Sequence, residues 1–163
     1  SQLDGAYRKA PQFAERRPWL EGIVMHPADN LFDYLYHSID ATRRLLGLDT
    51  RTIVSSSVPH DESLKAQGKV LALCAALGAT QYINAIGGME LYDSATFNAH
   101  AMTLRFLRPL SFEYAQFGAP FVAGLSILDV LMFNSIPETN IALRSQFALV
   151  EPGANGNLQM EPG

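Results

Sequence analysis

Residues 81–107, QYINAIGGMELYDSATFNAHAMTLRFL, decide the fold of this chain. Apolar and β-branched residues in 81–84 and in 103–107 predict two strands. A short helix that starts near Asp93, with Phe97 facing inward, is predicted between them. The order strand, helix, strand is typical of a parallel pair, because a parallel return needs a long crossover connection.

Working outward toward the amino terminus, residues 30–46 are predicted to form a helix that Asn30 caps. A strand is predicted over 51–55, where β-branched residues gather, and a helix over 62–77 with Asp61 as its cap. Gly47 and Gly78 are expected to end the two helices. The stripe that we expect the first helix to bury is Leu31, Leu35, Ile39, Thr42 and Leu46.

Outside this region, residues 1–27 are expected to form short helical turns, because Pro11 and Pro18 interrupt them. Helices are predicted over 125–134 and 138–147. The expected fold is α/β, with a small, mainly parallel sheet flanked by helices. It is predicted as one domain over residues 1–150, followed by a flexible tail over 151–163. The smallness of the sheet suggests that the fold is incomplete without an upstream segment.

Composition narrows the functional class. The chain has 163 residues and a net charge of -4, which argues against a nucleic-acid partner. No apolar run is long enough to span a bilayer, and no signal peptide is evident, so a cytoplasmic protein is predicted. Charged residues are only 17% of the chain, a low value that suggests a covered surface: a partner, a second copy or a missing piece of the same polypeptide.

The loops after the three predicted strands are polar and rich in glycine. Ligands of open parallel sheets lie beyond the carboxyl ends of the strands, so these loops are expected to meet around a small polar substrate. The substrate-binding residues expected in these loops are Ser55, Asn84, Gly87, Gly88, Tyr92, Tyr114 and Gln116.

His60 is the most suggestive catalytic candidate, because an imidazole exchanges protons near neutral pH. Asp61 and Glu62, which follow it, have the ordinary alternative of capping a helix. Gly87 and Gly88 can present N–H groups to an anion, or can simply make a turn. Neither a GxGxxG nor a P-loop motif is present, which leaves any cofactor unknown.

Asp129 is the second catalytic candidate, since a carboxylate within an apolar helix needs partners. The alternative is a structural aspartate that holds a loop, and Arg105 and Arg108 are possible charge partners. Cys74 is expected in the core as a small apolar residue. The histidines are scattered without zinc-like spacing, so no metal is predicted.

Several segments, taken in order, resemble the WbqC-like family: YRKAP at 7–11, LGLDT at 46–50, QYINAIGGMELYD at 81–93, EYAQF at 113–117 and LSILDVLMFN at 125–134. The resemblance covers nearly all of residues 4–150. It is a resemblance to the carboxy-terminal part of such proteins, which usually carry an aromatic-rich region ahead of the first segment.

The resemblance implies a role in O-antigen or other bacterial surface-polysaccharide biosynthesis. This context and the polar loops together favour a group transferase that moves an acyl or aminoacyl group onto a sugar or amine. It also implies that Asn84, Gly87 and Gly88 line a pocket and that Tyr114 and Gln116 offer polar contacts. Asp129 would brace the site or take part, and Lys69 would contact an anionic substrate. The alternative is a non-catalytic binding or assembly module. Such a module would act through a homo-oligomer or through an interface with another protein.

Overall fold

The structure, a computed structural model, describes residues 2–118 and 120–153, and it forms two compact units. The first unit combines Ser1–Arg51 with Ser111–Gln146, and the second combines Thr52–Leu110 with Phe147–Gly163. Most of the predicted tail lies outside the described residues, and a single domain over 1–150 stays a prediction. No helix in the described part of the chain is long and apolar enough to cross a bilayer.

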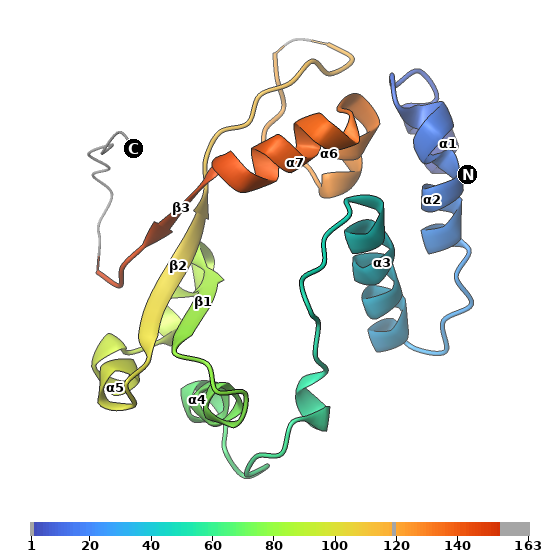
Figure 1. The fold of residues 1–163 in the computed structure, drawn as a ribbon. Helices are drawn as coiled ribbons and strands as arrows, with labels where there is room; N and C mark the ends of the chain where they lie inside the picture. The colour runs from blue at the N-terminus through green and yellow to red at the C-terminus, as the bar shows by residue number, and fades with distance from the viewer. Residues whose placement is uncertain (1, 119, 154–163) are drawn as a thin grey trace. The chain divides into compact units, whose positions relative to one another are not determined.

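Five helices make up the described part of the first unit (Figure 1). They are α1 (Gln2–Tyr7), α2 (Phe13–Val24), α3 (Leu31–Leu45), α6 (Ile127–Phe133) and α7 (Ile136–Ser145). Buried Ala10, Leu20 and Met132 form the centre of its core. The half-buried side chains packed around them are Tyr7, Phe13, Trp19, Leu128 and Phe133. The core therefore joins the start of the chain to α6.

Helix α2 continues through Pro18, so the prediction that this proline breaks the segment was wrong. A proline inside a helix removes one backbone hydrogen bond. Packing compensates, because α2 buries one face against its neighbours and most helical stability in proteins comes from such burial. The buried residues of that face are Arg16, Leu20 and Ile23.

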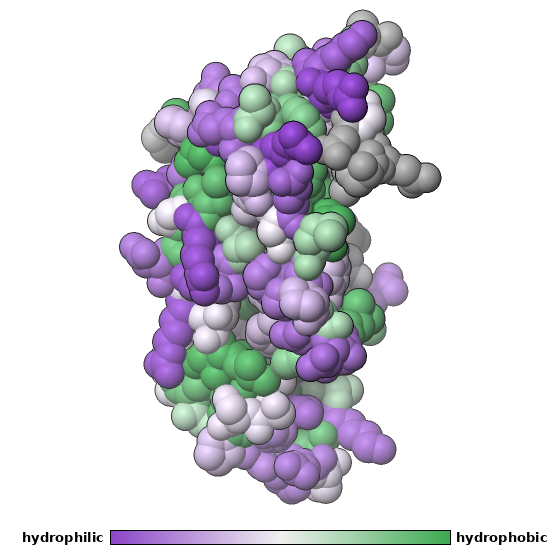
Figure 2. Space-filling view, turned by 90° about the vertical axis from the view of Figure 1, so that its right-hand side faces the viewer, coloured by the Kyte–Doolittle hydropathy of each residue, from purple (hydrophilic) through white to green (hydrophobic). Residues whose placement is uncertain are grey.

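The ends of α3 lie where the sequence predicts them, but the side chains predicted to be buried are mostly exposed. The Asn30 side chain accepts a hydrogen bond from the Asp33 N–H at 2.9 Å, and Gly47 has a φ of +65° just beyond the helix. The expected stripe is exposed along most of its length, with Leu31 at 72% and Ile39 at 55%. Figure 2 shows hydrophobic residues exposed among hydrophilic ones on the face that it draws.

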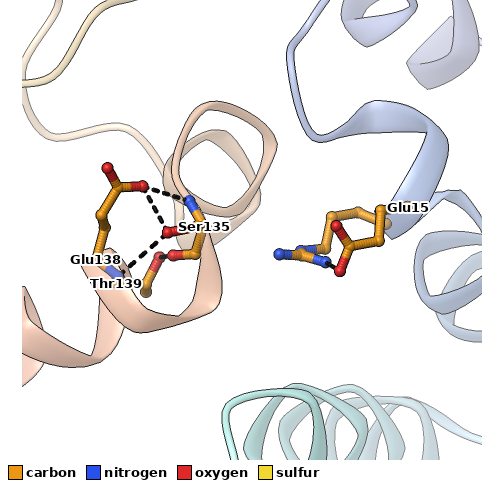
Figure 3. A network of polar contacts seen from close by, with 5 residues as sticks. Glu15, Ser135, Glu138 and Thr139 are labelled. Atoms are coloured by element: carbon orange, nitrogen blue, oxygen red, sulfur yellow. Dashed lines mark hydrogen bonds and ion pairs between the residues drawn. The ribbon is translucent and has the colours of Figure 1, made fainter.

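Helix α7 starts earlier than predicted because a capping box fixes its first turn (Figure 3). The Ser135 N–H donates to Glu138 Oε2 at 2.8 Å, while Ser135 Oγ accepts from the Glu138 N–H at 3.3 Å. Thr139 Oγ1 donates to the Ser135 carbonyl at 2.9 Å. The predicted end of this helix instead becomes a strand.

The second unit holds the sheet. Its elements are η1 (Ser55–Ser57), α4 (Ala66–Ala76), β1 (Gln81–Ala85), η2 (Ile86–Leu91), α5 (Ser94–Ala99), β2 (Thr103–Pro109) and β3 (Phe147–Val150). The strand order is β1-β2-β3, as Figure 1 shows. The predicted α/β class is confirmed. The sheet is mixed, however, and not mainly parallel, because β1 and β2 pair in parallel while β2 and β3 pair antiparallel.

Residues 51–55 do not form the predicted strand. This segment is irregular and passes into η1, because no described strand lies beside it to complete its backbone hydrogen bonds. Asp61 does not cap α4 either, since that helix starts at Ala66. Instead, Asp61 Oδ1 accepts from the Ser63 N–H at 2.9 Å, a local turn that competes with helix formation.

The core of the second unit is apolar and lies on one face of the sheet. Phe97 of α5 and Phe106 of β2 are fully buried, and Cys74 of α4 packs with them, as predicted. Burial raises the pKa of the Cys74 thiol. The opposite face of the sheet carries Leu107 and Leu149, which are exposed.

Candidate functional site

Asp129 lies in the first turn of α6 and is only 5% exposed. Ser126 caps this helix, because its Oγ accepts from the Leu128 N–H at 3.1 Å. The Asp129 N–H donates to the Ser126 carbonyl at 3.0 Å. The start of a helix favours negative charge, so this position suits a carboxylate.

Three neutral side chains donate to this carboxylate. Tyr7 Oη donates to Asp129 Oδ1 at 3.1 Å. On the other oxygen, Asp129 Oδ2 accepts from Tyr114 Oη at 2.7 Å and from Gln116 Nε2 at 3.0 Å. The donors come from α1 and from the segment before α6, so one carboxylate joins both of these to α6 within the first unit. We call these four residues the Asp129 bracket.

The tyrosines of the bracket are held as hydroxyl donors. Burial, and then the hydrogen bond to Asp129, raise the pKa of Tyr114 to about 12. Burial and the charge of Asp129 also raise the pKa of Tyr7. Both phenols therefore stay protonated at neutral pH. The carboxylate has room for about four hydrogen bonds, so the three donors leave it limited capacity for a substrate proton.

The bracket also shapes the loop that leads into α6. Gln116 Nε2 donates to the Val122 carbonyl at 3.2 Å, and the Val122 N–H donates to Gln116 Oε1 at 2.9 Å. The Tyr114 ring meets Phe121 edge-on with centroids 5.2 Å apart, a preferred geometry for aromatic pairs. Gln116 thus fixes the loop and the carboxylate together.

The charge partner suggested for Asp129 has a different role. Arg105 lies on β2, and its Nη1 pairs with Glu151 Oε1 at 3.0 Å. The described partners of Asp129 are the hydroxyls and the amide of the bracket.

A second group of the expected site residues meets in the second unit, at the end of β1. Asn84 Oδ1 accepts from the Ala85 N–H at 2.8 Å. A Cβ placed on Gly88 would lie 2.6 Å from Asn84 Nδ2, so any larger residue here would have to displace this amide. The same Cβ would lie 3.8 Å from the Tyr92 ring. Asn84, Gly88 and Tyr92 are therefore neighbours, and we call them the β1-end group.

Tyr92 belongs as much to the core as to this group. Its hydroxyl lies 3.2 Å from that of Tyr82, and its ring meets Phe97 edge-on with centroids 5.8 Å apart. Gly87 is exposed, and no other atom lies within 4 Å of where its Cβ would be. Lys69 lies half-buried on α4.

His60 follows η1 rather than a strand, so the premise that three parallel strands present the site was wrong. Its Nδ1 lies 2.6 Å from the Val58 carbonyl, which can only accept, so Nδ1 carries the proton. In the neutral ring the lone pair is on Nε2, which is buried without a hydrogen-bond partner among the described residues. Ser55 is exposed in η1, where its carbonyl accepts from the Val58 N–H at 3.2 Å.

The expected site residues thus form two separate sets, one in each unit. Tyr114, Gln116 and Asp129 meet in the first unit, and the β1-end group, His60, Ser55 and Lys69 belong to the second. Tyr7 is the bracket residue that sequence reasoning missed. The sequence feature that could have identified Tyr7 is its position in the YRKAP segment, which carries part of the family resemblance. Within the described ranges, no cluster of three His, Cys, Asp or Glu side chains could hold a metal ion.

The fold and the bracket define a mixed α/β protein in which α1 and the segment before α6 close on a buried carboxylate. A family model, the WbqC-like protein family, matches residues 1–141, and the chain belongs to that family. The match includes the first residues of the chain, so it is not confined to a carboxy-terminal part. No curated protein and no solved structure matches the chain with significance.

Proposed function

We propose that this WbqC-like protein serves bacterial surface-polysaccharide or related small-molecule biosynthesis. In this proposal it transfers an acyl or aminoacyl group to a sugar or an amine. Family membership supports the biosynthetic role. The site chemistry, and not the fold alone, has to support the reaction.

The observation that carries the proposal is the convergence of separate sequence segments on Asp129. Tyr7 lies 122 positions away along the chain, and Tyr114 lies 15 positions away. A buried carboxylate with three aligned donors requires a defined arrangement of these segments, because an unsatisfied buried donor costs about 1–3 kcal/mol. Such fixed polar geometry suits a site that orients a substrate.

In the second unit, His60 is proposed as the general base. An amine of the acceptor attacks the carbonyl carbon of the activated acyl donor, and a new C–N bond forms. His60 Nε2 takes the amine proton, and the bond from the carbonyl carbon to the leaving group breaks. The Asn84 amide and the Gly87 and Gly88 N–H groups would steady the negative charge that develops on the carbonyl oxygen.

The remaining expected residues keep supporting roles in the proposal. Ser55 and Tyr92 would donate hydrogen bonds to the acceptor, and Lys69 would attract an anionic substrate. In the first unit, Asp129 would brace Tyr114 and Gln116, whose polar contacts are proposed for that unit by itself.

The test is mass spectrometry of candidate sugar and amine acceptors after incubation of the purified protein with acyl and aminoacyl donors. His60→Gln should lower kcat at least 100-fold, because general base catalysis typically contributes about 10²–10⁴-fold. Transfer by His60→Gln at the wild-type rate would rule out the proposed base.

A matched pair of glycine variants tests the β1-end group. Gly88→Ala places a methyl group against the Asn84 amide and should raise KM or lower kcat about tenfold through displaced hydrogen bonds. Gly87→Ala meets no atom within 4 Å and is the control. Equal activity of the two variants would remove Asn84 from the site.

An assembly module is the second candidate, and the exposed apolar face of α3 favours it. Leu31, Phe32 and Ile39 are more than half exposed there. Interfaces are enriched in large apolar residues of this kind. If purified protein transfers no group while Phe32→Glu abolishes binding to another protein of the pathway, the assembly role replaces the enzymatic one.

A further inference from the structure

A groove of about 350 Å³ lies within the second unit, where side chains of α4 face those of α5. This volume falls in the range of small-ligand sites, which is about 300–1,000 Å³. The apolar part of the lining comes from α4 and the residues just before it: Leu64, Leu71, Ala72 and Ala75. The proposed reaction gives this groove no role, although the proposed base lies in the same unit.

The polar side chains that line the groove already have partners within the unit. Gln67 Oε1 accepts from the Asp93 N–H at 2.6 Å, and Thr96 Oγ1 donates to Asp93 Oδ2. His100 Nδ1 lies 2.8 Å from the Thr96 carbonyl and donates to it, because a carbonyl can only accept. These bonds hold α5 against the start of α4, so they fix the shape of the groove.

The charge of the lining is one-sided. Among the described residues, no acidic side chain is part of it. Asp93 lies behind Thr96 and caps α5, since its Oδ2 accepts from both the N–H and the hydroxyl of Thr96. A ligand with an ammonium group would therefore lose water here without gaining a carboxylate partner, which costs free energy.

Gly68 belongs to the same lining and leaves space in it. A Cβ at this position would lie 3.8 Å from Leu64 Cδ2, which is an ordinary contact. Neither packing nor backbone conformation thus requires a glycine here, and glycine inside a helix is destabilising relative to alanine. The missing side chain widens the groove along α4.

One end of the groove lies next to the β1-end group. Gln67 and Thr96 of the lining both bond to Asp93, and Asp93 directly follows Tyr92 in the chain. Tyr92 is the member of the β1-end group whose ring lies 3.8 Å from where a Gly88 Cβ would be. A donor whose carbonyl group lies at the β1-end group would therefore have this groove beside it for its chain.

We propose that this groove binds the hydrocarbon chain of an uncharged acyl donor, and that it selects acyl over aminoacyl groups. The apolar walls would bury methylene groups, and each buried methylene should tighten binding about fourfold. The inference rests on the proposed function, because it names the donor class of that reaction.

The test is an NMR titration of the full chain at pH 6.5, with methyl-labelled leucine and alanine, using butanamide, hexanamide and 2-aminohexanamide as unreactive probes. Hexanamide should shift the methyl signals of Leu64, Leu71 and Ala72 and bind at least fivefold more tightly than butanamide. The probe 2-aminohexanamide has the same chain and an α-ammonium group at this pH, so it should bind at least tenfold more weakly than hexanamide.

A matched pair of variants on α4 locates the binding. Ala72→Leu fills the groove and should weaken hexanamide binding at least fivefold. Ala76→Leu adds the same side chain at an exposed residue outside the lining and should bind within twofold of wild type. If circular dichroism shows that Ala72→Leu does not fold, the comparison of butanamide with hexanamide on wild type decides alone.

Equal affinities of the two variants, or of butanamide and hexanamide on wild type, would overturn the inference. Binding of 2-aminohexanamide as tight as that of hexanamide would overturn the selection of acyl groups. Hexanamide binding without transfer from any donor would sink the proposed reaction and leave the groove as an apolar site. Transfer with the same donor KM in Ala72→Leu and wild type would sink the groove and leave the reaction.

Discussion

Half-buried tyrosines occur in both units, but the partners of their hydroxyls differ. In the first unit, Tyr7 and Tyr114 donate to the Asp129 carboxylate. In the second unit, the hydroxyls of Tyr82 and Tyr92 lie 3.2 Å apart and pair with each other. Burial and the Tyr92 hydroxyl raise the pKa of Tyr82 above its usual range.

The sequence separations explain what this difference means. Tyr82 and Tyr92 are 10 positions apart, whereas Tyr7 and Asp129 are 122 apart. The second unit is held by an apolar core over a small sheet, in which residues between Leu71 and Phe106 pack with Val150 of β3. The first unit has a smaller buried core and depends on a polar bracket between distant segments.

The largest effect should come from the apolar core of the second unit. Phe106→Ala removes a fully buried ring and should lower the free energy of unfolding by about 4 kcal/mol. Urea denaturation measures the loss. Leu107→Ala, the exposed neighbour on β2, is the control and should cost less than about 1 kcal/mol. Similar losses in both variants would mean that the apolar core does not hold this unit.

Removing the centre of the bracket should have the next largest effect. Asp129→Ala leaves three donors unsatisfied and should cost about 3 kcal/mol of unfolding free energy. Asp129→Asn keeps an acceptor oxygen and should cost about half as much. Hydrogen exchange should rise first in the loop that Gln116 and Val122 close. Asp49→Ala, at an exposed acid, is the control, and an equally small change in both alanine variants would show that the bracket is dispensable.

Single hydroxyl deletions sharpen the comparison between the units. Tyr114→Phe loses a hydrogen bond to a charged group and should cost about 1.5–3 kcal/mol. Tyr82→Phe loses a neutral pair and should cost about 0.5–1.5 kcal/mol. Chemical denaturation of both variants side by side measures the difference. A larger loss for Tyr82→Phe would contradict the view that a polar bracket stabilises the first unit more than the tyrosine pair stabilises the second.

The smallest effect is a pH dependence at the alkaline end. The pKa of Tyr114 is raised from the usual 10.0 to about 12, so the folded state holds its proton more tightly than the unfolded state does. This contribution to stability is complete below the unfolded pKa and is lost as pH rises toward the folded one. Melting temperatures between about pH 9 and pH 12 should therefore fall less steeply in Tyr114→Phe than in wild type. Parallel curves for the two proteins would contradict the assigned proton.

Local signals in the sequence predicted several features well. Asn30 caps α3, and Asp93 caps α5 by accepting from the Thr96 N–H at 2.8 Å. The predicted strands at 81–84 and 103–107 form β1 and β2, and they pair in parallel. Each of these features depends on residues within one short segment, or on two strands joined by a single crossover.

The candidate site was predictable only in part, because its residues were named without their partners. Tyr114, Gln116 and Asp129 were all expected, but nothing in their spacing shows that they share one carboxylate. His60 was expected after a strand that does not form. Its tautomer follows from a contact with Val58 two residues away, which depends on the backbone conformation of the loop.

The amino-acid sequence by itself determined the ends of α3, the start of α5 and the positions of β1 and β2, since caps, turn residues and periodicity act over a few positions. Tertiary structure decided the rest: that β3 joins the sheet antiparallel, that the apolar stripe of α3 stays exposed, and that Tyr7 reaches Asp129. These outcomes depend on which distant segments meet. No local preference encodes such meetings, because their free energy comes from surfaces buried and hydrogen bonds satisfied between parts of the chain that are far apart in sequence.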